Sequence, residues 1–132
     1  MSAVVHVVAG ALFDARGQVL LAQRPPGAHM AGGWEFPGGK VEPGETPEAG
    51  LARELREELG IEVVASRPLI AYEHVYPQRT VLLDLRHVND YRGTPAGLEG
   101  QPLKWVPLAE LEHSGLLEAD RPMIGALRSL RG

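Results

Sequence analysis

Short apolar runs alternate with glycine- and proline-rich segments along most of the chain, a pattern typical of β-strands joined by turns. DARGQ at 14–18 predicts a turn, and the apolar run that follows it predicts the returning strand of a hairpin. A shorter piece, WEF at 34–36, predicts an extended segment. Five runs rich in branched or aromatic residues predict strands: residues 3–13, 19–24, 62–76, 80–88 and 103–108.

The connections between these runs carry residues that favour turns and loops. Residues 24–33 hold two prolines and three glycines and predict a loop, as do residues 93–102. GGK at 38–40 and PQR at 77–79 predict tight turns.

One segment in the middle of the chain has the signals of a helix at both ends. Thr46 suits the N-cap, Pro47 the first helical position and Gly60 the C-terminal cap. A second helix is predicted over 121–131, beginning near Asp120. Strand runs broken by one central and one terminal helix predict an α+β fold. We expect one domain (1–132) with a mixed β-sheet sandwiched between α-helices, in an α/β/α arrangement.

Three carboxylates share one face of the central helix. At 100° per residue, Glu54, Glu57 and Glu58 fall beside the leucine stripe rather than opposite it. Like charges at helical spacing repel by roughly 0.2–0.5 kcal/mol per exposed pair. A solvated face of Glu–Arg pairs is one interpretation. A site for a hard divalent cation such as Mg²⁺ is the other, and the nearby core and glycine-rich turn favour it.

Composition narrows the classes of partner. The chain of 132 residues has a net charge of −4, which argues against a polymeric nucleic acid because no basic face dominates. It has no cysteine, which excludes disulfides, zinc–thiolate sites and thiol catalysis. No apolar run approaches ~18 residues and no secretory signal is evident, so we expect a soluble cytoplasmic protein with no membrane partner.

The residues from Gly39 to Ile61 resemble a known family motif. Gly39, Glu45 and the run RELREELGI at 53–61 reproduce the Nudix box, G-x5-E-x7-R-E-U-x-E-E-x-G-U with U aliphatic, at every specified position. Similarity to the MutT branch of this family extends over nearly the whole chain, through AHMAGGWEFPGGKVEPGETPE and GLEGQP. LLAQRPPGAHMAGGWEF and ARELREELGIE also resemble a sister branch that acts on cytidine nucleotides.

The resemblance implies a Mg²⁺-dependent pyrophosphohydrolase, with Mn²⁺ able to substitute. Such enzymes convert a nucleoside triphosphate and water into the monophosphate and pyrophosphate. Carried over by position, Glu54, Glu57 and Glu58 are metal ligands together with the Gly38 carbonyl. Glu99 matches a further glutamate of the family, either as a ligand or as the base that deprotonates water. Glu54 is the other candidate base.

Other matching positions have supporting roles in the family. Arg53, a catalytic residue by this resemblance, and Glu45 match positions that pair to hold the loop against the helix. Gly60 is expected to be structural. Gly38 and Gly39 are expected to allow close backbone approach and positive φ, with Gly39 near the substrate.

Several residues outside the box are candidates for nucleotide binding. Arg24 and His29 match nucleotide-proximal positions of the MutT branch, with exposed loop residues as the alternative, and Phe36 is either a stacking partner or core. Trp34 and Tyr76 are possible pocket walls. The remaining histidines are expected to be structural or solvated: His6, His74, His87 and His113.

Asp120 is the main departure from the MutT pattern. The oxidised-guanine enzymes of that branch have Asn at the matching position, whereas the cytidine-type branch has Asp. A carboxylate accepts from an exocyclic amine such as N4 of cytosine, and a protonated carboxyl can also donate. The structural alternative is that Asp120 is a helix N-cap.

Three functions follow from these observations. The first is MutT-like removal of 8-oxo-dGTP from the nucleotide pool, which protects DNA. The second is hydrolysis of CTP, dCTP or 5-methyl-dCTP, which Asp120 favours. The third, a catalytically silent binding module, is disfavoured because all four glutamates are present. The sequence leaves monomer and homodimer both open.

Overall fold

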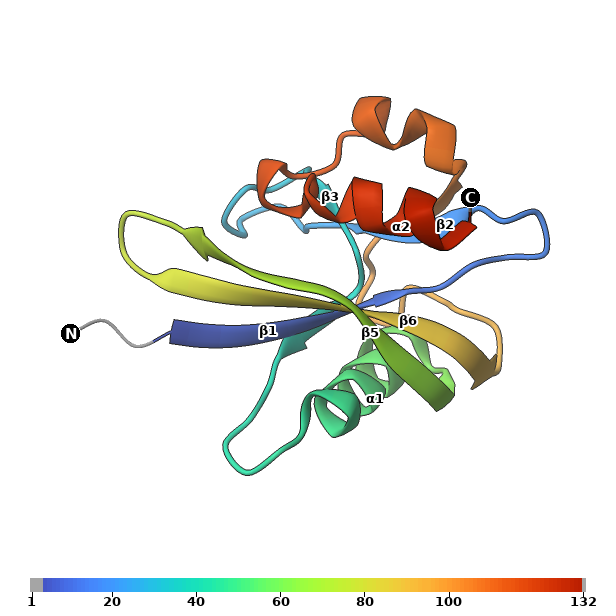
Figure 1. Cartoon of the computed structure of the whole chain (residues 1–132), viewed down its shortest axis with the longest axis horizontal. Helices are drawn as coiled ribbons and strands as arrows, with labels where there is room; N and C mark the ends of the chain where they lie inside the picture. The colour runs from blue at the N-terminus through green and yellow to red at the C-terminus, as the bar shows by residue number, and fades with distance from the viewer. Residues whose placement is uncertain (1–3, 132) are drawn as a thin grey trace.

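The computed structural model describes residues 4–131, which form two β-sheets (Figure 1). The larger sheet has the order β4-β1-β6-β5, in which β1 and β6 are parallel and the other pairs antiparallel. The smaller, antiparallel sheet has the order β3-β2-β7. The strands are β1 (Val4–Ala11), β2 (Val19–Gln23), β3 (Trp34–Glu35), β4 (Gly38–Lys40), β5 (Glu62–Val75), β6 (Thr80–Arg92) and β7 (Leu103–Val106).

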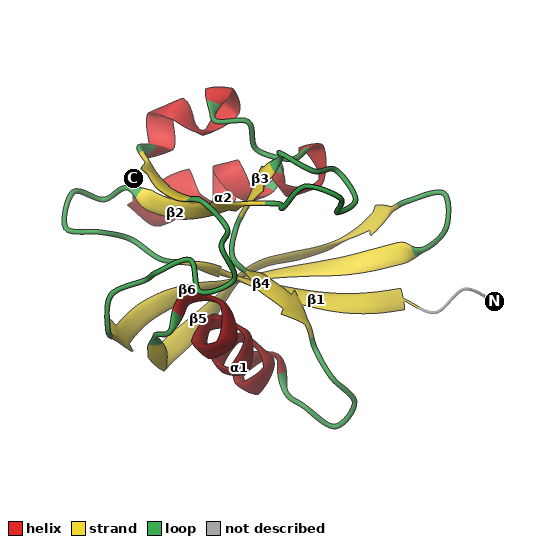
Figure 2. Ribbon diagram, turned by 180° about the vertical axis from the view of Figure 1, so that it is seen from behind, coloured by secondary structure: helices red, strands yellow, loops and turns green. Residues whose placement is uncertain are grey.

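Helices cover both faces of the larger sheet. Helix α1 (Pro47–Leu59) lies against one face, and α2 (Met123–Arg131) lies against the other together with the smaller sheet (Figure 2). Two short 3₁₀ helices, η1 (Leu108–His113) and η2 (Glu118–Asp120), precede α2. The predicted α+β class and the mixed sheet between helices are therefore confirmed.

Two hydrophobic cores lie on opposite faces of the larger sheet. Leu51, Leu55 and Leu59 of α1 are fully buried in one core against Val8 of β1. Met123 and Leu127 of α2 belong to the other core. Because successive strand residues face opposite sides, β1 supplies Val8 to one core and Ala9 to the other.

The ends of α1 are formed as its sequence predicts. Thr46 Oγ1 accepts a hydrogen bond from the Ala49 backbone N–H at 3.1 Å. Gly60 adopts φ 70°, a left-handed conformation, and its N–H donates to the Arg56 carbonyl at 3.1 Å. These two caps fix the length of the helix that carries the three glutamates.

Several predictions about elements need correction. β1 and β2 are joined by a turn and a bridge between Phe13 and Val19, but they enter different sheets rather than forming one hairpin. Residues 38–40 are an edge strand, not a turn, because they pair with β1. The last strand ends at Val106, and the C-terminal helix begins at Met123 rather than at 121. Ala3, the first residue of the first predicted strand, lies outside the described residues.

The helices between residues 4 and 131 include none that is both long and apolar enough to cross a membrane.

Candidate active site

The two glycines of β4 bring backbone and carboxylate close together. A Cβ on Gly39 would lie 2.4 Å from the carboxyl carbon of Glu54, and one on Gly38 would lie 2.0 Å from the Val8 carbonyl oxygen. The expected close approach is thus confirmed at both positions. The expected positive φ is wrong, since neither residue is among the glycines with positive φ. The absence of a Cβ, not left-handed backbone, is what this strand requires.

Arg53 joins the glycine-rich loop to α1. Its Nε and Nη2 donate to the two carboxylate oxygens of Glu45 at 2.8 and 3.0 Å, and Nη2 also donates to the Lys40 carbonyl at 3.0 Å. This two-point hydrogen bond from Arg53 lowers the pKa of Glu45 to about 2. The geometry matches the pairing that the family motif implies.

The same guanidinium also contacts two of the three clustered glutamates. Arg53 Nη1 donates to Glu54 at 3.0 Å and lies 3.6 Å from Glu57. Within residues 4–131, no three acidic or histidine side chains stand close enough together to hold a metal ion as they are. The Glu54 and Glu57 carboxylates are thus partly neutralised by Arg53 rather than turned toward a common centre.

Glu58 lies in a crowded, partly buried acidic environment. Burial first, then the charges of Glu54, Glu99 and Glu35, raise its pKa to about 8, against a hydrogen bond from the Gly38 backbone. The side chains of these glutamates offer carboxylate oxygens, the ligand type that hard divalent cations prefer. A dication would relieve their mutual repulsion, so the residues present suit such an ion.

The loop that carries Glu99 is attached to the C-terminal end of α1. Gln101 Nε2 donates to the Glu58 carbonyl at 3.0 Å, and Gln101 Oε1 accepts from the Glu99 backbone N–H at 2.9 Å. The Leu98 N–H also donates to the Glu58 carbonyl at 3.0 Å. These bonds bring Glu99 and Glu58 to one small recess, although they are far apart in sequence.

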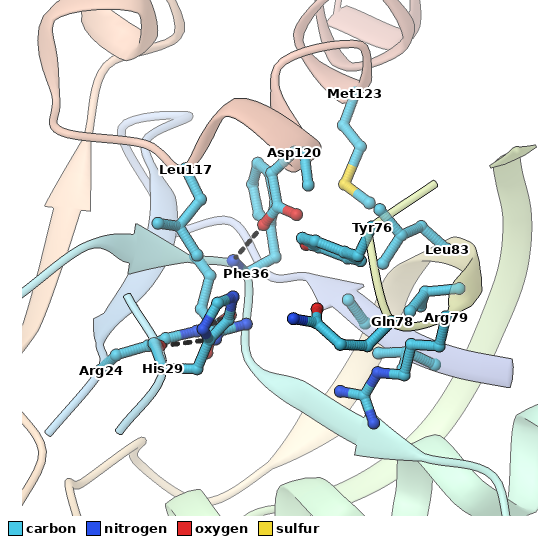
Figure 3. Close-up of a pocket in the computed structure, with 15 residues that line it drawn as sticks. Arg24, His29, Phe36, Tyr76, Gln78, Arg79, Leu83, Leu117, Asp120 and Met123 are labelled. Atoms are coloured by element: carbon cyan, nitrogen blue, oxygen red, sulfur yellow. Dashed lines mark hydrogen bonds and ion pairs between the residues drawn. The ribbon is translucent and has the colours of Figure 1, made fainter. Parts of the chain in front are cut away.

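A larger cavity of about 330 Å³ opens beside this recess (Figure 3). Its walls are mainly apolar or aromatic and come largely from β1, β6, the turn after β5 and the segment before α2. Arg24 and Glu35 border both the cavity and the recess. The cavity is lined by Val7, Ala9, Arg24, His29, Glu35, Phe36, Tyr76, Gln78, Arg79, Val81, Leu83, Leu117, Ala119, Asp120 and Met123.

Asp120 is a buried polar residue of the cavity wall. Only 7% of the residue is exposed, and its carboxylate accepts a hydrogen bond from the Phe36 backbone N–H at 3.3 Å (Figure 3). Burial, and then the charge of Glu35, raises its pKa to about 7. The alternative that Asp120 caps a helix is wrong, because its side chain faces the cavity and α2 begins only at Met123.

Of the other candidates for nucleotide binding, some line the cavity and one does not. Phe36 is only 3% exposed and belongs to a core, which confirms that interpretation. It also lines the cavity, and its stacking on a base stays a prediction. His29 and Tyr76 both line the cavity, with their rings edge-to-face at 6.0 Å. Trp34 is not a wall residue, because its ring packs against Lys104, 4.1 Å from the ammonium, and near Gly115.

The histidines outside the cavity have ring or charge contacts. His6 is hydrogen-bonded to Asp84 at 2.9 Å. His74 contacts the Tyr76 ring at 4.6 Å, and His87 contacts the Phe13 ring at 5.5 Å. His113 is exposed at the end of η1, so the expectation of structural or solvated histidines is confirmed.

Three polar cavity residues were not singled out from the sequence: Glu35, Gln78 and Arg79. Glu35 directly precedes Phe36 in the WEF segment, where strand alternation could have pointed to it. Gln78 and Arg79 lie in the PQR turn between β5 and β6, and Figure 3 shows the Gln78 amide turned toward the cavity. No local motif marks that turn, since the fold alone brings it to the site.

Comparison with known proteins agrees with this geometry. The sequence matches the NUDIX domain family over residues 8–126. It is 42% identical to the CTP pyrophosphohydrolase of Escherichia coli K12, over 96% of this chain and 93% of that protein. It is 36% identical to the 8-oxo-dGTP diphosphatase of the same organism, over 96% of this chain and 98% of that protein.

Solved structures lead to the same family. The solution structure of the E. coli ORF135 protein has a TM-score of 0.88 and 40% identity, covering 99% of this chain and 93% of that one. A MutT structure from work on Aliivibrio salmonicida and Vibrio cholerae has a TM-score of 0.83 and 33% identity, covering 97% and 99%. With its complete motif and matching fold, the chain belongs to the Nudix family of hydrolases, which generally need a divalent metal ion.

Proposed function

We propose that the protein hydrolyses nucleoside triphosphates to monophosphate and pyrophosphate, with 8-oxo-dGTP as its principal substrate. The observation that carries the proposal is the junction of two spaces, a cavity of about 330 Å³ with aromatic walls and an acidic recess. Arg24 and Glu35 border both. A base in the cavity would direct its phosphates past Arg24 toward the glutamates.

In this proposal Glu54, Glu57, Glu58 and Glu99, with the Gly38 carbonyl, hold the divalent ion. The donor set suits Mg²⁺, and Mn²⁺ as a substitute, because every ligand is an oxygen. When bound, the ion neutralises phosphate charge during attack by water. The pKa of Glu58 is raised first by burial and then by neighbouring carboxylates, so a bound cation would stabilise its charged form, which supports this assignment.

The remaining residues of the recess position these groups. The Arg53–Glu45 pair fixes the loop to α1, and its contact with Glu54 places that carboxylate beside Gly39. Either Glu54 or Glu99 removes the proton from the attacking water. The Gln101 bonds hold Glu99 beside Glu58 in both cases.

Base recognition is assigned to the cavity. Phe36 and Tyr76 supply aromatic surface, and Asp120 supplies a buried polar group. With a pKa of about 7, the Asp120 carboxyl is present in both forms near neutral pH. The protonated form donates and accepts, which suits an oxidised purine that offers O6 and N7–H side by side.

A second candidate substrate is a cytidine nucleotide: CTP, dCTP or 5-methyl-dCTP. The ionised form of Asp120 only accepts, which suits the exocyclic amine of cytosine. The 42% identity to an E. coli CTP pyrophosphohydrolase supports this alternative. A silent binding module has no comparable support, because all four carboxylates of the recess are present.

The reaction class is tested by identifying products. In Mg²⁺, ³¹P NMR of the reaction with 8-oxo-dGTP or CTP is expected to show a nucleoside monophosphate and pyrophosphate. EDTA should abolish the reaction, and Mg²⁺ should restore it. Release of a nucleoside diphosphate and inorganic phosphate would contradict the proposal.

Three wider statements belong to the same proposal. Residues 1–132 act as one catalytic domain, which the family match over 8–126 supports. The partner is a small nucleotide in the cytoplasm rather than a polymeric nucleic acid or a membrane, consistent with a net charge of −4. Sedimentation of the purified protein distinguishes the monomer from the homodimer.

A further inference from the structure

Glu35 is a carboxylate outside the family motif that borders both parts of the site. It lies on β3, where Ala22 of β2 is its antiparallel partner, next to the end of the strand that leads into Arg24. Its side chain is 32% exposed. The fold therefore holds an acidic group between the base cavity and the acidic recess.

The partner of Glu35 is Arg24, which in turn holds a loop. Arg24 Nε donates to Glu35 at 2.9 Å, and Arg24 Nη1 donates to the His29 carbonyl at 2.9 Å. The ring of His29 then lies against Tyr76 across the cavity. One guanidinium thus joins β3 to the 24–33 loop, and the loop places His29 on the wall of the cavity (Figure 3).

Glu35 and its partner Arg24 lie among other carboxylates. Glu35 is close enough to Glu58 and to Asp120 to raise the pKa of each. Arg24 is the cation that offsets Glu35 in this acidic surrounding. Glu35 holds the Arg24 guanidinium where the base cavity meets the acidic recess. That guanidinium is suited to bind an anionic nucleotide.

We propose that Glu35 is a positioning residue for nucleotide binding: it fixes the Arg24 guanidinium, and through it the 24–33 loop, where base and phosphates meet. The inference rests on the proposed function, because it assumes a nucleotide as the ligand. Arg24 and His29 then touch the nucleotide, and Glu35 acts through them. Such an interaction is made equally in the ground state and in the transition state, so its loss raises KM more than it lowers kcat.

The test compares Glu35→Ala, Glu35→Gln and the control Glu73→Gln. The Gln side chain keeps an oxygen that can accept from Arg24, whereas Ala does not. Glu73 is exposed on β5 and pairs with Leu82, whose neighbours Val81 and Leu83 line the cavity, so its side chain faces away from the cavity while the charge change is the same. With the preferred triphosphate and saturating Mg²⁺, Glu35→Ala is expected to raise KM about 10-fold or more, with kcat within about 3-fold.

Two further results are expected. Glu35→Gln should be milder than Glu35→Ala, and Glu73→Gln should match the wild type. A loss confined to kcat would place Glu35 at the chemical step and overturn the inference. Kinetic constants of Glu35→Ala equal to those of the wild type would overturn it as well.

Hydrogen exchange separates failure of this inference from failure of the proposed function. The Gly32 N–H donates to the Arg24 carbonyl at 3.1 Å, and the Arg24 N–H to the Gly33 carbonyl at 2.9 Å. In the protein without nucleotide, Glu35→Ala should speed exchange of these amides, and Glu73→Gln should not. If the wild type hydrolyses no triphosphate, the proposed function fails. If exchange is unchanged in Glu35→Ala, Glu35 does not hold the loop.

Discussion

The Asp120 carboxyl group is almost fully buried, so we expect its charge to affect both base selection and stability. The neutral amide of Asn presents a donor and an acceptor at any pH, as the oxidised purine requires. Asp120→Asn is therefore expected to raise the ratio of kcat/KM for 8-oxo-dGTP to that for dCTP by about 10-fold or more, since one well-placed bidentate pair discriminates by about 1–3 kcal/mol. Unchanged ratios would remove Asp120 from base recognition.

The same carboxyl group predicts how stability depends on pH. Its pKa rises from an ordinary value of 3.8 to about 7 in the folded protein. The folded state therefore binds more protons than the unfolded state between these values, and stability from this group falls as pH rises through that range. The free energy of unfolding of Asp120→Asn, relative to that of the wild type, should therefore rise by about 2 kcal/mol between pH 5 and pH 8. Urea unfolding with EDTA measures this difference.

The control for this prediction is Asp90→Asn, because Asp90 is exposed at the end of β6. Its difference from the wild type should stay constant between the two pH values. A constant difference for Asp120→Asn too would contradict the raised pKa.

Replacing Glu57 tests the assignment of the glutamates as metal ligands. Its side chain is 56% exposed, so replacing it should leave the fold intact. Glu57→Gln is expected to lower kcat by about 100-fold or more, because loss of even a supporting group around a metal site costs 10–100-fold. Circular dichroism verifies the fold, and Glu62→Gln, at the exposed start of β5, is the matched control. Near-normal turnover by Glu57→Gln would exclude a role as metal ligand.

At the scale of elements, we expect substitutions at two adjacent residues of β4 to have different effects, one on stability and the other on activity. A methyl group on Gly38 meets the backbone of β1, whereas one on Gly39 meets only the end of the flexible Glu54 side chain. Gly38→Ala should therefore cost about 1–3 kcal/mol of stability. Gly39→Ala should change stability by less than about 1 kcal/mol, yet reduce kcat strongly by displacing Glu54.

Denaturant unfolding and steady-state kinetics on both variants test this separation, each variant serving as the control for the other. Equal losses of stability would contradict this prediction, because they would show that the Glu54 side chain does not move aside for a methyl group on Gly39. An active Gly39→Ala enzyme of normal stability would show that Glu54 need not occupy that position.

The elements that could be predicted are those with local signals. Helix α1 has Thr46 before it and Gly60 after it, and both caps form as expected. β4 could not be predicted, because GGK has the composition of a turn and becomes a strand only by pairing with β1. The division into two sheets was missed for a similar reason. The turn between β1 and β2 is local, but the partners of β2 are the distant β3 and β7.

At the scale of the whole molecule, the recess could be predicted better than the cavity. Most of the candidate ligands lie in one motif on α1 and its preceding loop, so spacing alone groups them. The cavity draws on β1, the turn after β5 and the segment before α2, and only the fold brings these together. Asp120 was singled out by its departure from the family pattern, whereas Gln78 and Arg79 had no signal.

The junction of cavity and recess accounts for both parts of the proposed activity. In the proposed function, Phe36, Tyr76 and Asp120 select the base on one side, and the glutamate cluster supports cleavage of the triphosphate on the other. Arg24 and Glu35 lie between them. Selectivity and turnover are thus expected to respond to different residues, with Asp120 governing the first and Glu57 the second.

The most direct test is kcat/KM in Mg²⁺ for 8-oxo-dGTP, dGTP, CTP, dCTP, 5-methyl-dCTP and ADP-ribose. The account predicts a preference for 8-oxo-dGTP over dGTP of about 100-fold or more, equivalent to about 2.7 kcal/mol of transition-state discrimination. It also predicts that 8-oxo-dGTP exceeds the cytidine nucleotides. A preference for CTP, dCTP or 5-methyl-dCTP would contradict the assignment of 8-oxo-dGTP and make Asp120 the residue that selects cytosine.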